Sequence, residues 1–133
     1  DKEKKEEYKE QNLQYLEEIA SQEGVKKLAD GIIQSDRAGN GTVSPRLDSV
    51  VSGSLSGDLI NGREFDNSYK RNCPEAFRLS QVIEGWQIAL QQMHAGDKWI
   101  VYIPYTCGYG NRASGPIPAF STLIFEVELL GIA

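Results

Sequence analysis

The chain has 133 residues, 40% of them hydrophobic, which suits one ordinary domain with a substantial core. Its formal net charge of −5 weighs against non-specific nucleic-acid binding, which needs a basic stripe, so we expect no nucleic-acid partner. No apolar run in the sequence approaches the roughly 20 residues of a membrane-spanning helix, and we expect no membrane span.

The N-terminal segment predicts a charged helix. Residues 1–12 alternate acidic and basic side chains and hold almost nothing apolar, which is typical of a solvated helix. Apolar residues then recur at helical spacing, at Leu13, Leu16, Ile19 and Ala20. We expect an amphipathic helix over about residues 5–23, stopped at Gly24. Its narrow apolar stripe could pack on the body of the domain, on a second copy of the chain or on an upstream segment.

The next part of the chain loses the helical period. Residues 31–45 predict a strand followed by a turn region rich in Gly, Asn and Pro. Residues 50–65 then alternate with period two. One face of that strand carries Val51, Gly53, Leu55, Gly57 and Leu59. The dipeptide Asn61-Gly62 is a strong hairpin-turn signal.

The second half of the chain predicts one short helix among strands. We expect strands over residues 75–79, 98–104 and 122–132, a helix over 84–93 and a long loop over 105–121. A buried stripe on the helix is indicated by Val82, Trp86, Leu90 and Met93. One face of the last strand carries Leu123, Phe125, Val127 and Leu129. The pattern as a whole predicts an α+β fold, an antiparallel sheet covering one short helix.

Few residues suggest conventional catalytic chemistry. His94 is the only histidine and stands where the helix should end, so we expect a surface or C-terminal cap role. No Cys/His metal spacing exists, and a nucleophilic triad has thin support. The two cysteines, Cys73 and Cys107, fit unpaired thiols, with a disulfide between them as the alternative.

Four segments together resemble one enzyme family. They are INGREFDNSYKR (60–71), VIEGW (82–86), YGNRASGPIP (109–118) and STLIFEVELL (121–130). In this order and spacing they resemble the FKBP-type peptidyl-prolyl cis–trans isomerases, the immunophilins that bind tacrolimus and rapamycin. The family fold is a twisted antiparallel β-sheet wrapped around one short central helix. The resemblance implies an isomerase domain over residues 31–133, and an N-terminal charged helical extension over 1–30 like that of bacterial envelope members.

The resemblance also implies a site. The proposed catalytic residues are Trp86 as the floor under the prolyl ring, Asp66 as the acid beside the substrate, Tyr109 as a hydroxyl donor at the mouth and Phe125 as an apolar wall. The proposed substrate-binding residues are Phe65 and Ile117 in the walls, Arg71 as the partner of Asp66, Val82 and Ile83 at the rim, and Leu55. The backbone N–H of Ile83 is expected to hold a substrate carbonyl. Such a site needs no nucleophile, metal or cofactor.

Two departures from the family leave a second function open. Leu55 stands where the family carries a tyrosine whose hydroxyl contacts the acid, so Asp66 should depend more on Arg71 and Tyr109. Glu75 replaces an apolar or aromatic residue on the pocket lip. The first expectation is an isomerase that assists the folding of proline-containing polypeptides. The alternative is a weakly active or inactive binding module or chaperone.

The resemblance gives weaker indications about the cellular setting. It favours a bacterial cell envelope or periplasm, with the cytoplasm as the alternative. Macrolides of the tacrolimus and rapamycin type are candidate ligands. We expect a monomer, or a weak dimer formed through the N-terminal helix. A disulfide joining the two pocket loops that carry Cys73 and Cys107 stays open.

Overall fold

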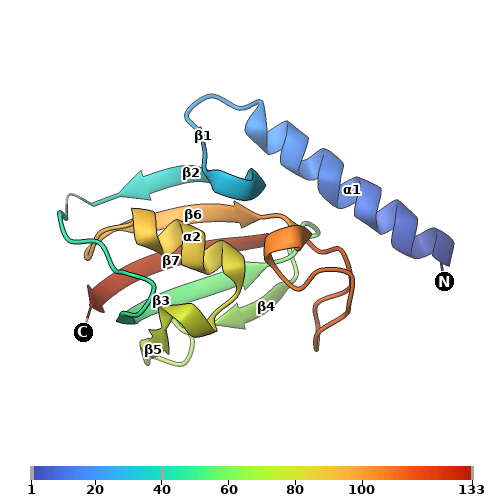
Figure 1. Cartoon of the computed structure of the whole chain (residues 1–133). Coiled ribbons are helices and arrows are strands. Elements are labelled where there is room, and N and C mark those ends of the chain that lie inside the picture. The colour runs from blue at the N-terminus through green and yellow to red at the C-terminus, as the bar shows by residue number, and fades with distance from the viewer. Residues whose placement is uncertain (1, 40, 133) are drawn as a thin grey trace.

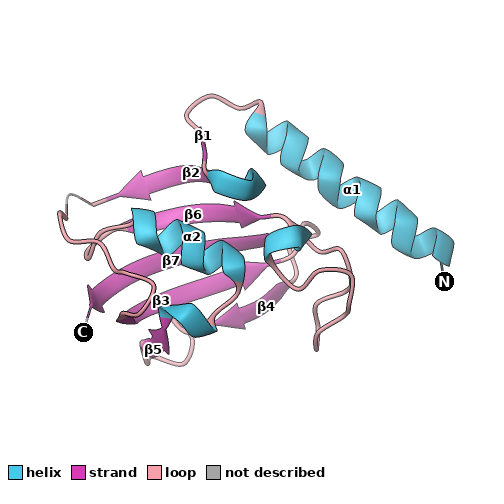
Figure 2. Cartoon of the chain, viewed as in Figure 1, coloured by secondary structure: helices cyan, strands magenta, loops and turns pink. Residues whose placement is uncertain are grey.

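The computed structural model describes residues 2–39 and 41–132, and within them one antiparallel sheet carries a short helix on one face. A longer helix lies beside the sheet at the N-terminal end (Figure 1). Figure 2 shows that the loops gather at the two ends of the strands. This is the predicted α+β fold, with the short helix in the centre.

The elements follow the predicted order. The helices are α1 (Lys2–Ala20) and α2 (Glu84–Gln92). The strands are β1 (Lys26–Lys27), β2 (Ile33–Ala38), β3 (Val50–Asp58), β4 (Glu64–Asn67), β5 (Glu75–Arg78), β6 (Lys98–Ile103) and β7 (Leu123–Ile132). The first helix begins and ends about one turn earlier than expected, and β1 was not predicted because two lysines carry no strand period.

The strand order is β1-β2-β6-β7-β3-β4, with every neighbouring pair antiparallel. Two strands share one edge of β3. β5 pairs with its first half, Val50 to Gly53, and β4 with its second half, Ser56 to Asp58. The chain therefore leaves the sheet between β4 and β5, and residues 68–74 form a loop beside the end of β4.

The core lies between α2 and the sheet. Side chains that are at most 5% exposed include those of β3 (Val51, Leu55), of α2 and the residue after it (Trp86, Leu90, Met93), of β6 (Trp99, Val101, Ile103) and of β7 (Leu123, Phe125, Val127, Leu129). The alternation predicted for the two strands is confirmed. Of the stripe predicted for the helix, Trp86, Leu90 and Met93 are buried, whereas Val82 lies before α2 and is only partly buried. Full burial of each such side chain contributes about 1.5–3 kcal/mol, so this layer holds α2 on the sheet.

Helix α1 packs on the body of its own chain. Leu16 and Ile19 are buried against Ile33 of β2. One turn before Leu16, the side chain of Asn12 is fully buried and its Oδ1 accepts a 2.7 Å hydrogen bond from the backbone N–H of Thr122. Of the three alternatives for the apolar stripe, the structure has the first, although Leu13 of the predicted stripe is exposed. No helix of the described part of the chain is both long and apolar enough to cross a bilayer.

Candidate active site

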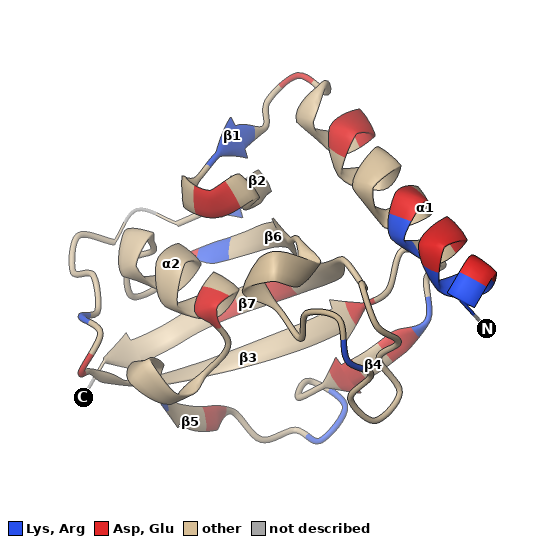
Figure 3. Ribbon diagram, turned by 45° about the vertical axis from the view of Figure 1, so that its right-hand side comes forward, with Lys and Arg blue, Asp and Glu red and all other residues tan. Residues whose placement is uncertain are grey.

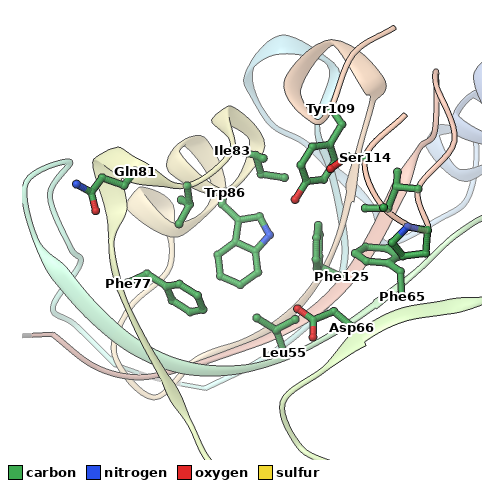
Figure 4. Close-up of a pocket in the computed structure, with 14 residues that line it drawn as sticks. Leu55, Phe65, Asp66, Phe77, Gln81, Ile83, Trp86, Tyr109, Ser114 and Phe125 are labelled. Carbon is green, nitrogen blue, oxygen red and sulfur yellow. The ribbon is translucent and has the colours of Figure 1, made fainter. Parts of the chain in front are cut away.

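An open cavity of about 510 Å³ lies at the N-terminal end of α2, between the sheet and the loop that follows β6 (Figure 4). Most of its lining is apolar and aromatic. The lining residues are Leu55, Phe65, Asp66, Phe77, Gln81, Val82, Ile83, Trp86, Tyr109, Ser114, Gly115, Pro116, Ile117 and Phe125. A concave, largely apolar cavity with a few polar groups is the usual form of a small-ligand site.

Trp86 forms the floor of this cavity. It lies in the first turn of α2, where its backbone N–H donates a 3.0 Å hydrogen bond to the carbonyl of Ile83. The side chain is 5% exposed, yet the indole lies in the middle of the lining side chains (Figure 4). Two rings hold it edge to face, Phe125 at 5.2 Å and Phe77 at 5.4 Å between ring centroids. The indole is thus fixed in place with one surface toward the cavity.

The walls are built by a second aromatic pair. Phe65 of β4 and Phe125 of β7 meet edge to face, with centroids 5.5 Å apart. Gly57 of β3 lies under this pair, because a Cβ atom there would be 2.5 Å from Cζ of Phe65 and 2.9 Å from Cε1 of Phe125. The absent side chain leaves the space that the two rings occupy.

Asp66 brings the one carboxylate to the lining, at the end of β4. Its Oδ1 accepts hydrogen bonds from Nη1 of Arg71 at 2.8 Å and from the backbone N–H of Asn67 at 2.9 Å. Arg71 also donates through Nη2 to Glu75. These bonds, first to Asp66 and then to Glu75, raise the pKa of Arg71 above its ordinary value. The guanidinium therefore stays charged and shared between two carboxylates.

Two polar donors belong to residues that line the cavity. The backbone N–H of Ile83 donates to no acceptor among the described residues, because Ile83 precedes the first turn of α2. The Tyr109 side chain is 41% exposed, and Figure 4 shows its hydroxyl directed toward the cavity. No hydrogen bond joins Tyr109 to Asp66 in the part of the chain described, so Asp66 depends on Arg71 and the backbone of Asn67 instead.

Comparison with known proteins agrees with this geometry. Residues 41–130 match the family model described as FKBP-type peptidyl-prolyl cis-trans isomerase. The chain belongs to this family. The FKBP-type 22 kDa peptidyl-prolyl cis-trans isomerase of Escherichia coli is 43% identical over 124 residues, covering 92% of this chain and 60% of that protein. The macrophage infectivity potentiator of Trypanosoma cruzi is 39% identical over 120 residues, 89% of this chain and 61% of that protein.

Solved structures show the same FKBP fold. A peptidyl-prolyl cis-trans isomerase from Pseudomonas syringae superposes with a TM-score of 0.88 at 35% identity, over 96% of this chain and 95% of that one. FkpA from Escherichia coli superposes with a TM-score of 0.88 at 38% identity, over 98% of this chain and 63% of that one. The chain spans about three fifths of the length of the two curated relatives named above. The family and fold expected from the four sequence segments are confirmed.

Every predicted site residue except Arg71 lines the FKBP cavity. Arg71 lies in the loop between β4 and β5 and contacts the site only through Asp66.

From the sequence alone, Phe77 was missed, although its ring contacts Trp86, because a single aromatic residue in a four-residue strand is a weak signal. Gln81 and Ser114 were also missed, because loop residues carry no period that would direct them to a cavity. Glu75 does not line the cavity and is the second partner of Arg71. The catalytic roles of all these residues remain predictions.

The cysteines are both free thiols, Cys73 exposed and Cys107 buried, so the disulfide alternative is wrong. Burial raises the pKa of Cys107. Ligand atoms of Asp30, Glu84 and Cys107 lie within 4.8 Å of one another. Both carboxylates are exposed, and the raised pKa of Cys107 disfavours the thiolate that a metal would need, so we assign no metal to this group.

His94 lies after the end of α2, with its Nδ1 3.2 Å from Oδ2 of Asp97.

Proposed function

We propose that this chain catalyses the cis–trans isomerisation of peptide bonds that precede proline. The observation that carries the proposal is the indole of Trp86 at the base of an open aromatic cavity that Ile83 also lines, where the backbone N–H of Ile83 has no acceptor among the described residues. A flat apolar floor suits the pyrrolidine ring, and the N–H suits a neighbouring substrate carbonyl.

The proposed mechanism follows from the chemistry of the amide. Rotation about the prolyl C–N bond is opposed by a barrier of roughly 18–20 kcal/mol, because the planar amide is stabilised by resonance. The twisted transition state has lost that resonance and is less polar than the ground state. An apolar cavity therefore stabilises the transition state more than the substrate, which is the condition for acceleration. Hydrogen bonds from Ile83 and Tyr109 would hold the rotated form.

A protease-coupled assay on a proline-containing peptide tests the proposal. Uncatalysed exchange takes about 10–100 s, and the protein should shorten this time. Tyr109→Phe removes one hydroxyl from an exposed side chain and should lower kcat/KM about two- to tenfold, the effect of one hydrogen bond. Tyr105→Phe is the matched control, because Tyr105 lies in the same loop but does not line the cavity. A wild-type protein that leaves the uncatalysed rate unchanged contradicts the proposal.

A second function, chaperone-like binding with little turnover, is favoured by Leu55 and Glu75. Leu55 supplies apolar bulk but no hydroxyl that could donate to Asp66. Glu75 accepts a hydrogen bond from Arg71, so Asp66 shares this cation with a second carboxylate. Suppression of client aggregation by a protein without isomerase activity would support this function. Tacrolimus or rapamycin should compete with either kind of ligand if macrolides bind in the same cavity. Light scattering tests the expected monomer against the weak dimer through α1.

A further inference from the structure

A second cleft lies next to the isomerase cavity. Its volume is about 510 Å³, and it separates the start of α1 from the loop that follows β6. The lining residues are Lys4, Lys5, Tyr8, Asn111, Arg112, Ala113, Pro118 and Ala119. The residues in between, Ser114 to Ile117, line the isomerase cavity. One short loop is therefore the wall between the two spaces.

The cleft is locally basic in an acidic protein. Lys4, Lys5 and Arg112 are exposed, and none of them forms an ion pair within the described residues. No carboxylate is among the lining residues, although the chain has a net charge of −5. An anionic group entering this cleft would meet three cations that pair with no carboxylate of the described residues.

The fold of α1 produces this charge. With 3.6 residues per turn, positions 4, 5, 8, 9 and 12 share one side of a helix. The opposite side carries Glu3, Glu6, Glu7 and Glu10. Tyr8 and Asn12 contact the domain, so the lysine side is the side turned toward the loop. Charges that alternate along the sequence are thus sorted in space, within the charge-dense first half of α1 seen in Figure 3.

The two sides of the cleft are tied together. The hydroxyls of Tyr8 and Ser121 lie 2.9 Å apart, and Ser121 donates a 2.7 Å hydrogen bond to the carbonyl of Pro118. Nζ of Lys9 lies 5.1 Å from the centroid of the Phe120 ring. These contacts preorganise the cleft, which reduces the ordering that binding would require.

We propose that this cleft extends the substrate site and binds an acidic segment of the client polypeptide on one side of the isomerised proline. The inference rests on the proposed isomerase function. With proline in the cavity, a polypeptide that crosses the loop at Ser114 to Ile117 brings its neighbouring residues to the cleft. Asp or Glu side chains there would pair with Lys4, Lys5 and Arg112, the last able to bind a carboxylate with two parallel hydrogen bonds.

Four peptides with the same central Xaa-Pro bond test this. Their flanks are neutral, acidic before the proline, acidic after it, or basic. For wild type, kcat/KM for one of the acidic peptides should be about three- to tenfold higher than for the neutral peptide, and the difference should come from a lower KM. The effect is modest because exposed ion pairs are individually weak. The preference should shrink between about 0.01 M and 0.5 M salt, because screening weakens exposed pairs.

The decisive variants are charge reversals. Lys4→Glu/Lys5→Glu/Arg112→Glu should abolish the acidic preference and leave the neutral peptide within about twofold, since the cations and the cavity are separate. Acidic side chains near a helix N-terminus are favourable, so α1 should persist. Lys26→Glu/Lys27→Glu/Arg46→Glu is the matched control, with the same change in net charge at exposed positions that line neither space. If both triple variants lose the preference for the acidic peptide equally, the preference is an effect of net charge and the proposal is overturned.

The two proposals fail in distinguishable ways. A wild-type protein that does not accelerate the neutral peptide contradicts the isomerase function alone. The cleft is then tested by titrating the protein with an acidic peptide that contains no proline and following the amide chemical shifts of the protein. Shifts at Asn111 and Arg112 that the cleft variant removes support the inference. Absence of binding at low salt, or shifts confined to the Trp86 indole, overturns it.

Discussion

The indole of Trp86 meets the ring of Phe125 edge to face, with centroids 5.2 Å apart and planes at 90°. One ring comes from α2 and the other from β7, so the contact joins helix and sheet at the base of the cavity. Phe77 of β5 and Phe65 of β4 extend it to a chain of four rings. Edge-to-face pairs contribute about 0.5–1.5 kcal/mol beyond the burial of their area. The apolar surface proposed to stabilise a twisted amide is therefore held by its own neighbours.

Gly57 should prove to be a positioning residue for this chain of rings. A methyl group in Gly57→Ala would push into Phe65 and Phe125, at a cost of about 1–3 kcal/mol, typical of overpacking. We expect a lower free energy of unfolding, a lower kcat/KM and a changed near-UV circular dichroism spectrum. Ser56→Ala is the matched control on the same strand, because Ser56 does not line the cavity. Unchanged activity in a destabilised Gly57→Ala protein would show that the rings need not stay in place.

Leu55→Tyr should raise turnover if the missing phenol limits the reaction. Leu55 is 3% exposed and lines the cavity near Asp66 (Figure 4). A tyrosine hydroxyl donated to Asp66 should raise kcat/KM about two- to tenfold, the value of one hydrogen bond. Leu55→Phe adds the ring without the hydroxyl and separates the two contributions. If neither variant changes kcat/KM while both stay folded, the departure at this position does not restrict activity.

Asn12→Ala should weaken the attachment of α1 to the domain. The Asn12 side chain is fully buried, donates a 2.7 Å hydrogen bond to the carbonyl of Tyr8 and accepts one from the N–H of Thr122. Its removal leaves that N–H buried without a partner, which costs about 1–3 kcal/mol. Urea denaturation should report this loss, and amide exchange at Thr122 should become faster. Gln11→Ala, an exposed neighbour on the same helix, should change the free energy of unfolding by less than about 0.5 kcal/mol.

Local patterns predicted the elements well and their assembly poorly. The alternation from Leu123 to Leu129 depends only on which face is buried, so it is visible in the sequence. That β4 and β5 share one edge of β3 depends on long-range pairing, which no local period encodes. The site residues came from family motifs, and those motifs did not include Phe77. The basic side of α1 is not visible in the sequence, where acidic and basic residues alternate. It appears only when the chain coils, because residues three or four positions apart then lie on the same side of the helix.

Cys107 should make the protein less stable at alkaline pH. Burial raises the pKa of the thiol in the folded state above its ordinary value of 9.0. Below that value the thiol is protonated in both states, and its contribution to stability is fully present. As the pH rises above about 9, the unfolded chain loses the proton first, so the free energy of unfolding falls until the folded-state pKa is passed. Tyr15 and Tyr69, whose pKa values burial raises from 10.0, should add a later loss.

Denaturation at pH 8.0 and 9.5 isolates the cysteine from the tyrosines. The loss of stability between these two pH values should be smaller in Cys107→Ala, whatever the cost of the substitution itself. Cys73→Ala is the control, because that thiol is exposed and Cys107 is buried. A thiol reagent should likewise modify Cys73 within the dead time of mixing and Cys107 only as the fold opens. Equal pH dependence in the two variants, or fast modification of both thiols, would contradict the burial of Cys107.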